Sequence, residues 1–169
     1  EAILIPAMLR RSGLSVKDSL VIYGILNGMS IPFILFPTAL INALAILVLP
    51  TVSEAQAMNN ERLIERTSMV AIKYSLIIGI ISTGLFILFG QDLGNDVFHN
   101  KLAGTYLVIL AWLCPFIYLT TTLGSIINGL GKANITFINS IISSVCKIIL
   151  IAFMIPSLGI RGYLISLLV

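Results

Sequence analysis

The chain has 169 residues, of which 58% are hydrophobic and only 10% are charged, and its mean hydropathy is +1.07. These values lie far outside the range of soluble domains and indicate an integral membrane protein. The formal net charge of +3 is small and is spread over the connections, which excludes the dense basic face of a nucleic-acid-binding protein.

Both ends of the sequence are apolar. Residues 1–9 lead into the basic pair Arg10 and Arg11, as expected where a membrane helix reaches the headgroups. Residues 162–169 form an apolar run that is too short to cross a bilayer. We therefore expect the end of one helix over 1–9, the start of another over 162–169, and a chain that is a fragment of a longer polytopic protein.

A long uncharged run follows the first connection. No charged side chain occurs between Asp18 and Glu54, a length well beyond the roughly 20 apolar residues that a membrane helix needs. The run predicts a span over 19–53. Proline removes a backbone donor and clashes with the preceding turn, so Pro32 and Pro37 predict a kinked helix. In lipid such a kink must be covered by protein or line a cavity, which favours a place against the bundle interior.

Three further spans are predicted, over 68–89, 102–130 and 135–155. The polar stretch over 59–66 suits a helix that lies in the membrane interface, and residues 92–101 are typical of a turn-rich loop in water. Together with the span over 19–53 they make four full spans, and Pro115 predicts a bend in the third, over 102–130. No strand periodicity suggests a barrel, so the predicted fold class is an all-α polytopic transmembrane helix bundle.

The charges do not decide the orientation in the membrane. If successive connections alternate sides, the basic residues divide almost evenly between the two faces, and the positive-inside count is nearly balanced. One face would carry Arg10, Arg11, Lys17, Lys101 and Arg161, and the other Arg62, Arg66, Lys73 and Lys132.

Lys147 is the first candidate for a functional residue. It lies near the middle of an apolar span, where a charge costs at least about 2.5 to 3.5 kcal/mol, so it should not face lipid. Two interpretations remain open. The ammonium group either points into a polar cavity and attracts an anionic substrate group, or it snorkels or pairs with a neighbouring helix.

Arg10, Arg11, Asn27 and Asn42 complete the set of candidate substrate-binding residues. The planar guanidinium of arginine binds phosphate oxygens bidentately, although basic residues at helix ends also serve as plain headgroup anchors. The amides of Asn27 and Asn42 can hydrogen-bond to sugar hydroxyls or to other helices, as can the amides of Asn128 and Asn139.

Nothing in the sequence predicts catalysis. The acidic residues are confined to connections, no Ser, His and Asp are spaced as a triad, and no phosphate-binding GxxxxGK[ST] loop is present. Cys114 and Cys146 lack metal-ligand spacing and are interpreted as reduced thiols, and His99 has no matching ligands. We expect no enzyme activity, no cofactor and no metal site.

Several short motifs, in order and spacing, resemble the stage V sporulation protein B group, in the polysaccharide exporter branch of the multidrug/oligosaccharidyl-lipid/polysaccharide flippase superfamily. The matching residues cover nearly the whole chain: Ile5-Pro6, Leu9, Gly13, Tyr23-Gly24, Asn27-Gly28-Met29, Pro32, Phe36-Pro37, Leu49 to Ala55, Leu107 to Tyr118, Asn128 to Lys132, Pro156, Gly159-Ile160 and Gly162-Tyr163. In one departure, the family motif often has Arg where this sequence has Met8.

The resemblance implies part of one of two pseudo-symmetric helix lobes around a cavity that alternates between the membrane faces. The fragment would run from the end of the seventh helix to early in the twelfth, with the Lys132 connection cytoplasmic and the Arg10 connection external. The implied function is transport of a lipid-linked oligosaccharide or peptidoglycan precursor across the bacterial cytoplasmic membrane. The implied cargo is linked through undecaprenyl pyrophosphate, and the full-length protein would serve wall synthesis or sporulation.

Two other functions remain open. A cation-coupled multidrug antiporter on the same fold should place acidic residues within its spans, and a membrane glycan polymerase should have a large catalytic loop. Neither feature occurs in this sequence. The expected partners are the lipid-linked saccharide, membrane lipids and the remaining helices of the full-length chain, with no nucleic acid.

Overall fold

The structure is a computed structural model that describes residues 5–6 and 15–158. The described residues form an all-helical protein without strands, which confirms the predicted fold class. Five helical stretches in this part of the chain are long and apolar enough to cross a membrane. Arg10, Arg11, the span end over 1–9 apart from residues 5–6, and the helix start over 162–169 lie outside the described residues.

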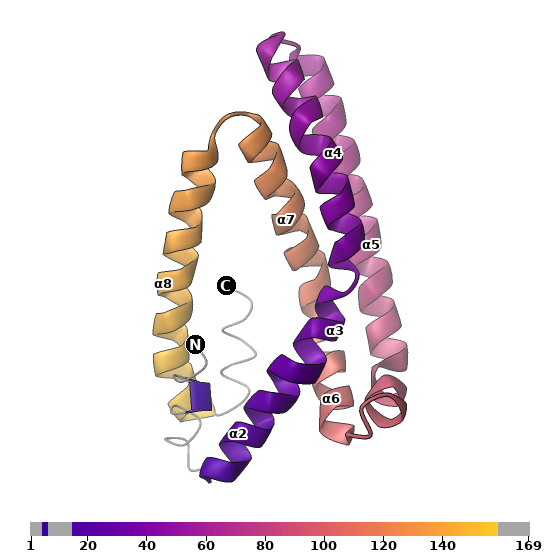
Figure 1. Cartoon of the computed structure of the whole chain (residues 1–169), viewed down its shortest axis with the longest axis vertical. Helices are drawn as coiled ribbons and strands as arrows, with labels where there is room; N and C mark the ends of the chain where they lie inside the picture. The colour runs from indigo at the N-terminus through magenta and orange to yellow at the C-terminus, as the bar shows by residue number, and fades with distance from the viewer. Residues whose placement is uncertain (1–4, 7–14, 159–169) are drawn as a thin grey trace.

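The first long element is a broken helical rod. Its two arms, Val16–Leu35 and Thr38–Ala57, are each long enough to span a membrane and continue in the same overall direction (Figure 1). The sequence predicted one kinked span over 19–53. The rod consists of α2 (Val16–Ile25), the π-helical turn η1 (Leu26–Ser30), α3 (Ile31–Leu35) and α4 (Thr38–Ala57).

The break between α3 and α4 follows from Pro37, which has no N–H to continue the helical ladder. Around it the ladder tightens to three-residue spacing, since the Ala39 N–H donates to the Phe36 carbonyl at 3.2 Å. Two carbonyl groups near the break lose their usual backbone N–H donor, and side chains donate to them instead. The Thr38 hydroxyl donates to the Leu35 carbonyl, and the Tyr118 hydroxyl, from a distant helix, donates to the Ile34 carbonyl at 2.9 Å.

The second rod is a single helix, α5 (Glu61–Asp96), capped by the Asn60 side chain, which accepts from the Leu63 N–H at 3.1 Å. Its 36 residues measure about 54 Å at 1.5 Å per residue, which exceeds the hydrocarbon core of about 30 Å. The predicted interfacial helix over 59–66 is wrong, because residues 61–66 are the first turns of α5. The helix also extends past the predicted span of 68–89 and into the stretch predicted as a loop over 92–101.

The third rod is broken as well. It consists of α6 (Lys101–Leu110), the short 3-10 turn η2 (Ala111–Leu113) and α7 (Cys114–Gly129), and the predicted span was 102–130. Pro115 occupies the first turn of α7, directly after η2. The Thr83 hydroxyl of α5 donates to the Ala111 carbonyl at 3.0 Å, so this break too has a hydroxyl partner from a neighbouring helix.

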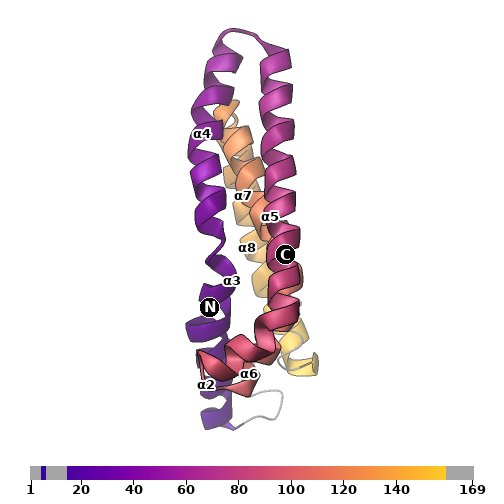
Figure 2. The same ribbon diagram turned by 90° about the vertical axis from the view of Figure 1, so that its right-hand side faces the viewer.

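The three rods pack against one another, and both views show α4 and α5 side by side with α7 against them (Figures 1 and 2). Small residues allow the close approach. A Cβ atom on Gly79 of α5 would lie 2.6 Å from Pro115 Cα, and one on Gly94 would lie 2.3 Å from Gly104 Cα. These residues belong to the buried face of α5, which is formed by Ala71, Ser75, Gly79, Ser82, Phe86, Gly90 and Gly94.

The last described helix, α8 (Ala133–Leu158), forms a hairpin with α7 and includes the predicted span of 135–155. The turn requires Gly131, whose φ of +72° lies in the left-handed region that glycine favours. Only 11% of the most apolar window of α8 is buried, against 50% for the α6–α7 rod. Among the described spans, α8 therefore has the smallest share of its surface covered.

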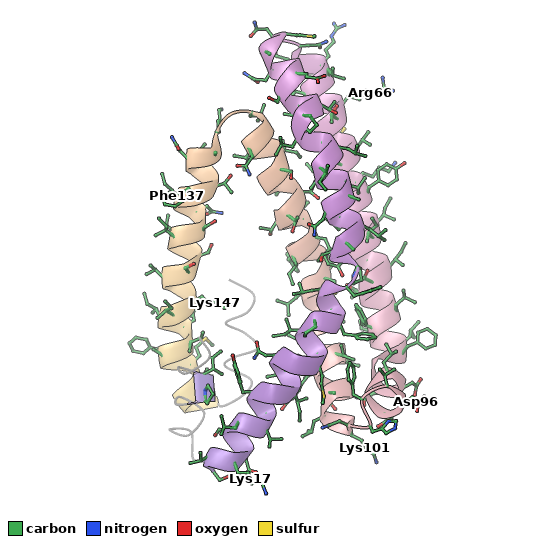
Figure 3. The ribbon with its side chains drawn as sticks, in the orientation of Figure 1. Lys17, Arg66, Asp96, Lys101, Phe137 and Lys147 are labelled. Carbon is green, nitrogen blue, oxygen red and sulfur yellow. The ribbon has the colours of Figure 1, made fainter. Side chains whose placement is uncertain are left out.

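Four of the five charged side chains that Figure 3 labels lie at the two ends of the molecule. Arg66 lies near the tip of the α4–α5 hairpin, whereas Lys17, Asp96 and Lys101 lie at the opposite end (Figure 3). Arg66, Lys17 and Lys101 are therefore grouped as alternating connections predict. Lys147 alone among the labelled charges lies between these two levels.

Candidate functional site

A polar stripe runs along one side of α8. Thr136, Ser140, Ser143 and Lys147 follow at intervals of three or four residues. At 3.6 residues per turn, all four fall within about 60° of one another around the helix axis. The opposite face of α8 consists of exposed aliphatic residues, Ile138, Ile142, Val145 and Ile149.

Lys147 lies near the centre of this helix. It is 14 residues from Ala133 and 11 from Leu158, or roughly 21 Å and 16 Å along the axis, and its side chain is half-buried. It also takes part in an interaction within the structure. The charge is therefore far from both helix ends and on the polar side of α8.

A groove between α7 and α8 lies beside the same stripe, nearer to the hairpin turn. It has a volume of about 440 Å³, within the usual range for small-ligand sites. Five of its nine lining residues carry a hydroxyl or an amide, and none is charged. The polar ones are Thr120 from α7 and Thr136, Asn139, Ser140 and Ser143 from α8.

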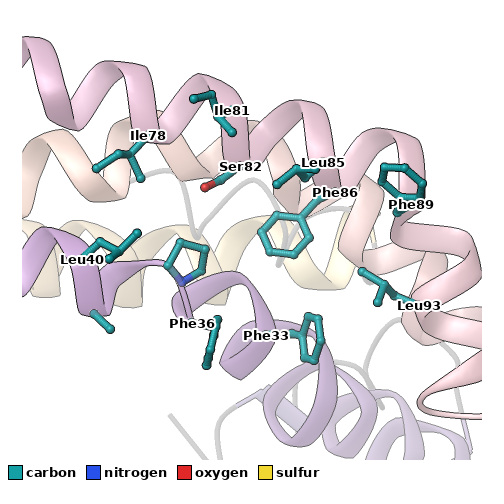
Figure 4. Close-up of a pocket in the computed structure, with 12 residues that line it drawn as sticks. Phe33, Phe36, Leu40, Ile78, Ile81, Ser82, Leu85, Phe86, Phe89 and Leu93 are labelled. Carbon is teal, nitrogen blue, oxygen red and sulfur yellow. The ribbon is translucent and has the colours of Figure 1, made fainter.

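A second groove has the opposite chemistry. It lies beside the α3–α4 break, between the broken rod and α5, and has a volume of about 680 Å³ (Figure 4). Ser82 is the single polar residue among its twelve lining residues, which include Phe33, Phe36 and Phe89. This surface can accept apolar groups, but it offers almost no partner for a sugar or a phosphate.

The other predicted site residues do not join the α8 stripe. The Asn27 amide lies in η1 and donates to the carbonyl of Tyr23, one turn earlier in α2, at 3.3 Å. Asn42 is exposed on α4, which packs against α5 and α7, with α8 on the far side of α7. Arg10 and Arg11 lie outside the described residues.

The α8 hydroxyls were missed in the sequence, although a signal was present. Thr136, Ser140 and Ser143 stand at helical spacing from Lys147, and this spacing alone places them on its face. Thr120 carried no such signal, because its place in the groove depends on how α7 pairs with α8.

The chain is similar to stage V sporulation protein B. It shares 23% identity over 164 residues with that protein from Bacillus subtilis (strain 168), and the match covers 96% of this chain. The same match covers 32% of the relative, so the chain spans about a third of that protein's length. No protein-family model matches the sequence, and no solved structure matches it.

The similarity and the five apolar helical stretches together indicate a membrane protein. A helix with four polar residues on one side and aliphatic residues on the other can line a polar interior while facing lipid.

Proposed function

We propose that this chain is part of a transporter that moves a lipid-linked saccharide across the bacterial cytoplasmic membrane by alternating access. The similarity to a protein named for stage V of sporulation supports a role in sporulation. The proposed activity makes and breaks no covalent bond, so the chain needs binding groups and mobile helices but no catalytic residues.

The observation that carries the proposal is the position of Lys147. A charged group at the bilayer centre is costly unless it meets a polar partner, and the Lys147 face of α8 is lined with hydroxyls. An ammonium group there attracts an anion, and the pyrophosphate of a prenyl-pyrophosphate-linked saccharide is an anion that must pass the membrane centre.

The two broken rods support alternating access. Helices with interrupted hydrogen bonding near the membrane centre are typical of transporters, because such breaks let helix segments change direction. The breaks after Leu35 and around Ala111 both receive hydroxyl donors from neighbouring helices. A change in one rod is therefore linked to the others through specific hydrogen bonds.

The proposal is tested with the full-length protein in proteoliposomes and a fluorescent undecaprenyl-pyrophosphate-linked saccharide. Hydrogen bonds to charged groups contribute about 1.5 to 3 kcal/mol, so Lys147→Met should slow lipid translocation by about 10- to 150-fold. Lys132→Met, which removes the same charge from the exposed α7–α8 connection, is the matched control and should keep the wild-type rate. Size-exclusion profiles of both variants establish that they remain folded.

A cationic dye is followed in parallel under a sodium or proton gradient. Wild-type protein should flip the lipid without moving the dye. Dye antiport without lipid flipping would replace the proposed substrate with a drug-like cation, and wild-type flipping by Lys147→Met would remove the proposed role of the lysine.

A further inference from the structure

The groove between α7 and α8 offers hydrogen-bonding groups between two helices that are otherwise largely apolar. Its five polar residues contrast with the single polar residue of the groove at the α3–α4 break. Polar side chains within a membrane normally find partners in protein, in water or in a ligand. The partners available to each side chain therefore indicate what the groove can bind.

Two of the hydroxyls are partly used by their own helices. The Thr120 hydroxyl donates to the Phe116 carbonyl at 2.8 Å, and the Ser140 hydroxyl donates to the Thr136 carbonyl at 2.9 Å. Each hydroxyl oxygen keeps its lone pairs, because a hydroxyl carries one donor and two acceptor sites. These two residues can therefore accept hydrogen bonds from a ligand in the groove.

Thr136 is different, because its Oγ1 atom is buried and has no hydrogen-bond partner within the described part of the chain. Buried polar groups in proteins are almost always paired, so an unpaired one calls for an explanation. The Asn139 amide and the Ser143 hydroxyl, which line the same groove, also make no hydrogen bond among the described residues. Asn139 and Ser143 present both donors and acceptors to the groove, and the Thr136 hydroxyl joins them when rotation about χ1 brings its covered Oγ1 atom to the surface.

We propose that this groove binds the neutral hydroxyl groups of the saccharide, while Lys147 attracts the anionic pyrophosphate. The inference rests on the proposed function and adds a separate sugar subsite to it. An uncharged set of mixed donors and acceptors suits sugar hydroxyls, which also donate and accept, and offers no cation to a phosphate. Asn139 and Thr136 lie roughly 12 Å and 16 Å from Lys147 along α8, so one elongated ligand can contact both regions.

The test compares two soluble probes on the full-length protein in lipid nanodiscs. One probe is farnesyl pyrophosphate, and the other is the same molecule carrying a neutral disaccharide on its terminal phosphate. Wild-type protein should bind the disaccharide probe more tightly. Thr136→Val and Asn139→Leu should each weaken its binding by about 2- to 12-fold, the equivalent of one neutral hydrogen bond, and change the Kd of farnesyl pyrophosphate by less than twofold.

Two controls separate the sugar subsite from other effects. Thr121→Val makes the same chemical change on α7 outside the groove, at a hydroxyl that donates to the Ile117 carbonyl, and should alter neither Kd. Lys147→Met should weaken both probes, because both carry the pyrophosphate.

The inference is overturned if wild-type protein binds the two probes equally, if the groove variants leave the Kd ratio unchanged, or if they weaken both probes alike. Such a result would not contradict the proposed function, provided that wild-type protein binds farnesyl pyrophosphate tightly and Lys147→Met does not. Failure of wild-type protein to bind either probe would instead contradict the proposed function itself.

Discussion

Tyr118→Phe should loosen the break in the first rod without disturbing the packing around it. Tyr118 is fully buried, and its hydroxyl donates to the carbonyl of Ile34, which is 2% exposed. Phenylalanine keeps the ring and removes the donor. An unsatisfied buried acceptor costs about 1 to 3 kcal/mol, whereas hydrogen bonds between membrane helices average about 0.6 and reach about 1.7 kcal/mol. Because neither group is accessible, we expect a cost of about 1 to 2 kcal/mol.

Hydrogen–deuterium exchange of the full-length protein in nanodiscs measures this cost where it arises. A loss of 1 to 2 kcal/mol raises the population of the open break by about 5- to 30-fold, so amides over residues 31–40 should exchange faster by that factor. Tyr106→Phe is the matched control, since Tyr106 is also buried but its hydroxyl makes no hydrogen bond among the described residues. Equal exchange in the two variants would refute the role assigned to the Tyr118 hydroxyl.

Three further changes test the packing. Gly94→Ala places a Cβ 2.3 Å from the α6 backbone and should lower the free energy of unfolding by about 1 to 3 kcal/mol, measured by thermal unfolding. Gly84→Ala is the control, because open space surrounds Gly84, and it should not lower that free energy. A double-mutant cycle of Ser75→Ala and Thr122→Val, whose hydroxyls hydrogen-bond between α5 and α7, should give a coupling energy of about 0.6 to 1.7 kcal/mol, and zero coupling would contradict the bond. Gly131→Ala forces a side chain into the left-handed region and should cost about 1 kcal/mol, and unchanged unfolding would show that the turn relaxes.

The sequence predicted the helical class because its uncharged runs are long enough to cross a bilayer. Inside the bilayer such a run satisfies its own backbone hydrogen bonds by forming a helix. It could not predict what each proline does. Pro37 interrupts the first rod, whereas Pro50 lies inside the regular helix α4. The difference depends on partners that are distant in sequence, since the break at Pro37 is stabilised by Tyr118. No local pattern contains that contact.

The wrong interfacial helix has a physical cause. The charges from Glu61 to Arg66 mark where the chain leaves the hydrocarbon, but a helix does not have to end at the membrane surface. Asn60 caps the helix start, and no proline or glycine interrupts the chain between there and the apolar span. The helix therefore continues from the charged tip of the hairpin into the membrane.

The α8 stripe shows why average hydropathy fails to find a polar site. Of the five described spans, α8 has the most apolar window, yet it carries a lysine and a row of hydroxyls on one side. The aliphatic face formed by Ile138, Ile142, Val145 and Ile149 cancels those polar residues in any average. Lipid can cover that aliphatic face but not Lys147, so the two faces of α8 require different surroundings. This asymmetry indicates a helix at the boundary between lipid and a polar interior, which is where the proposed transporter of a lipid-linked saccharide needs one.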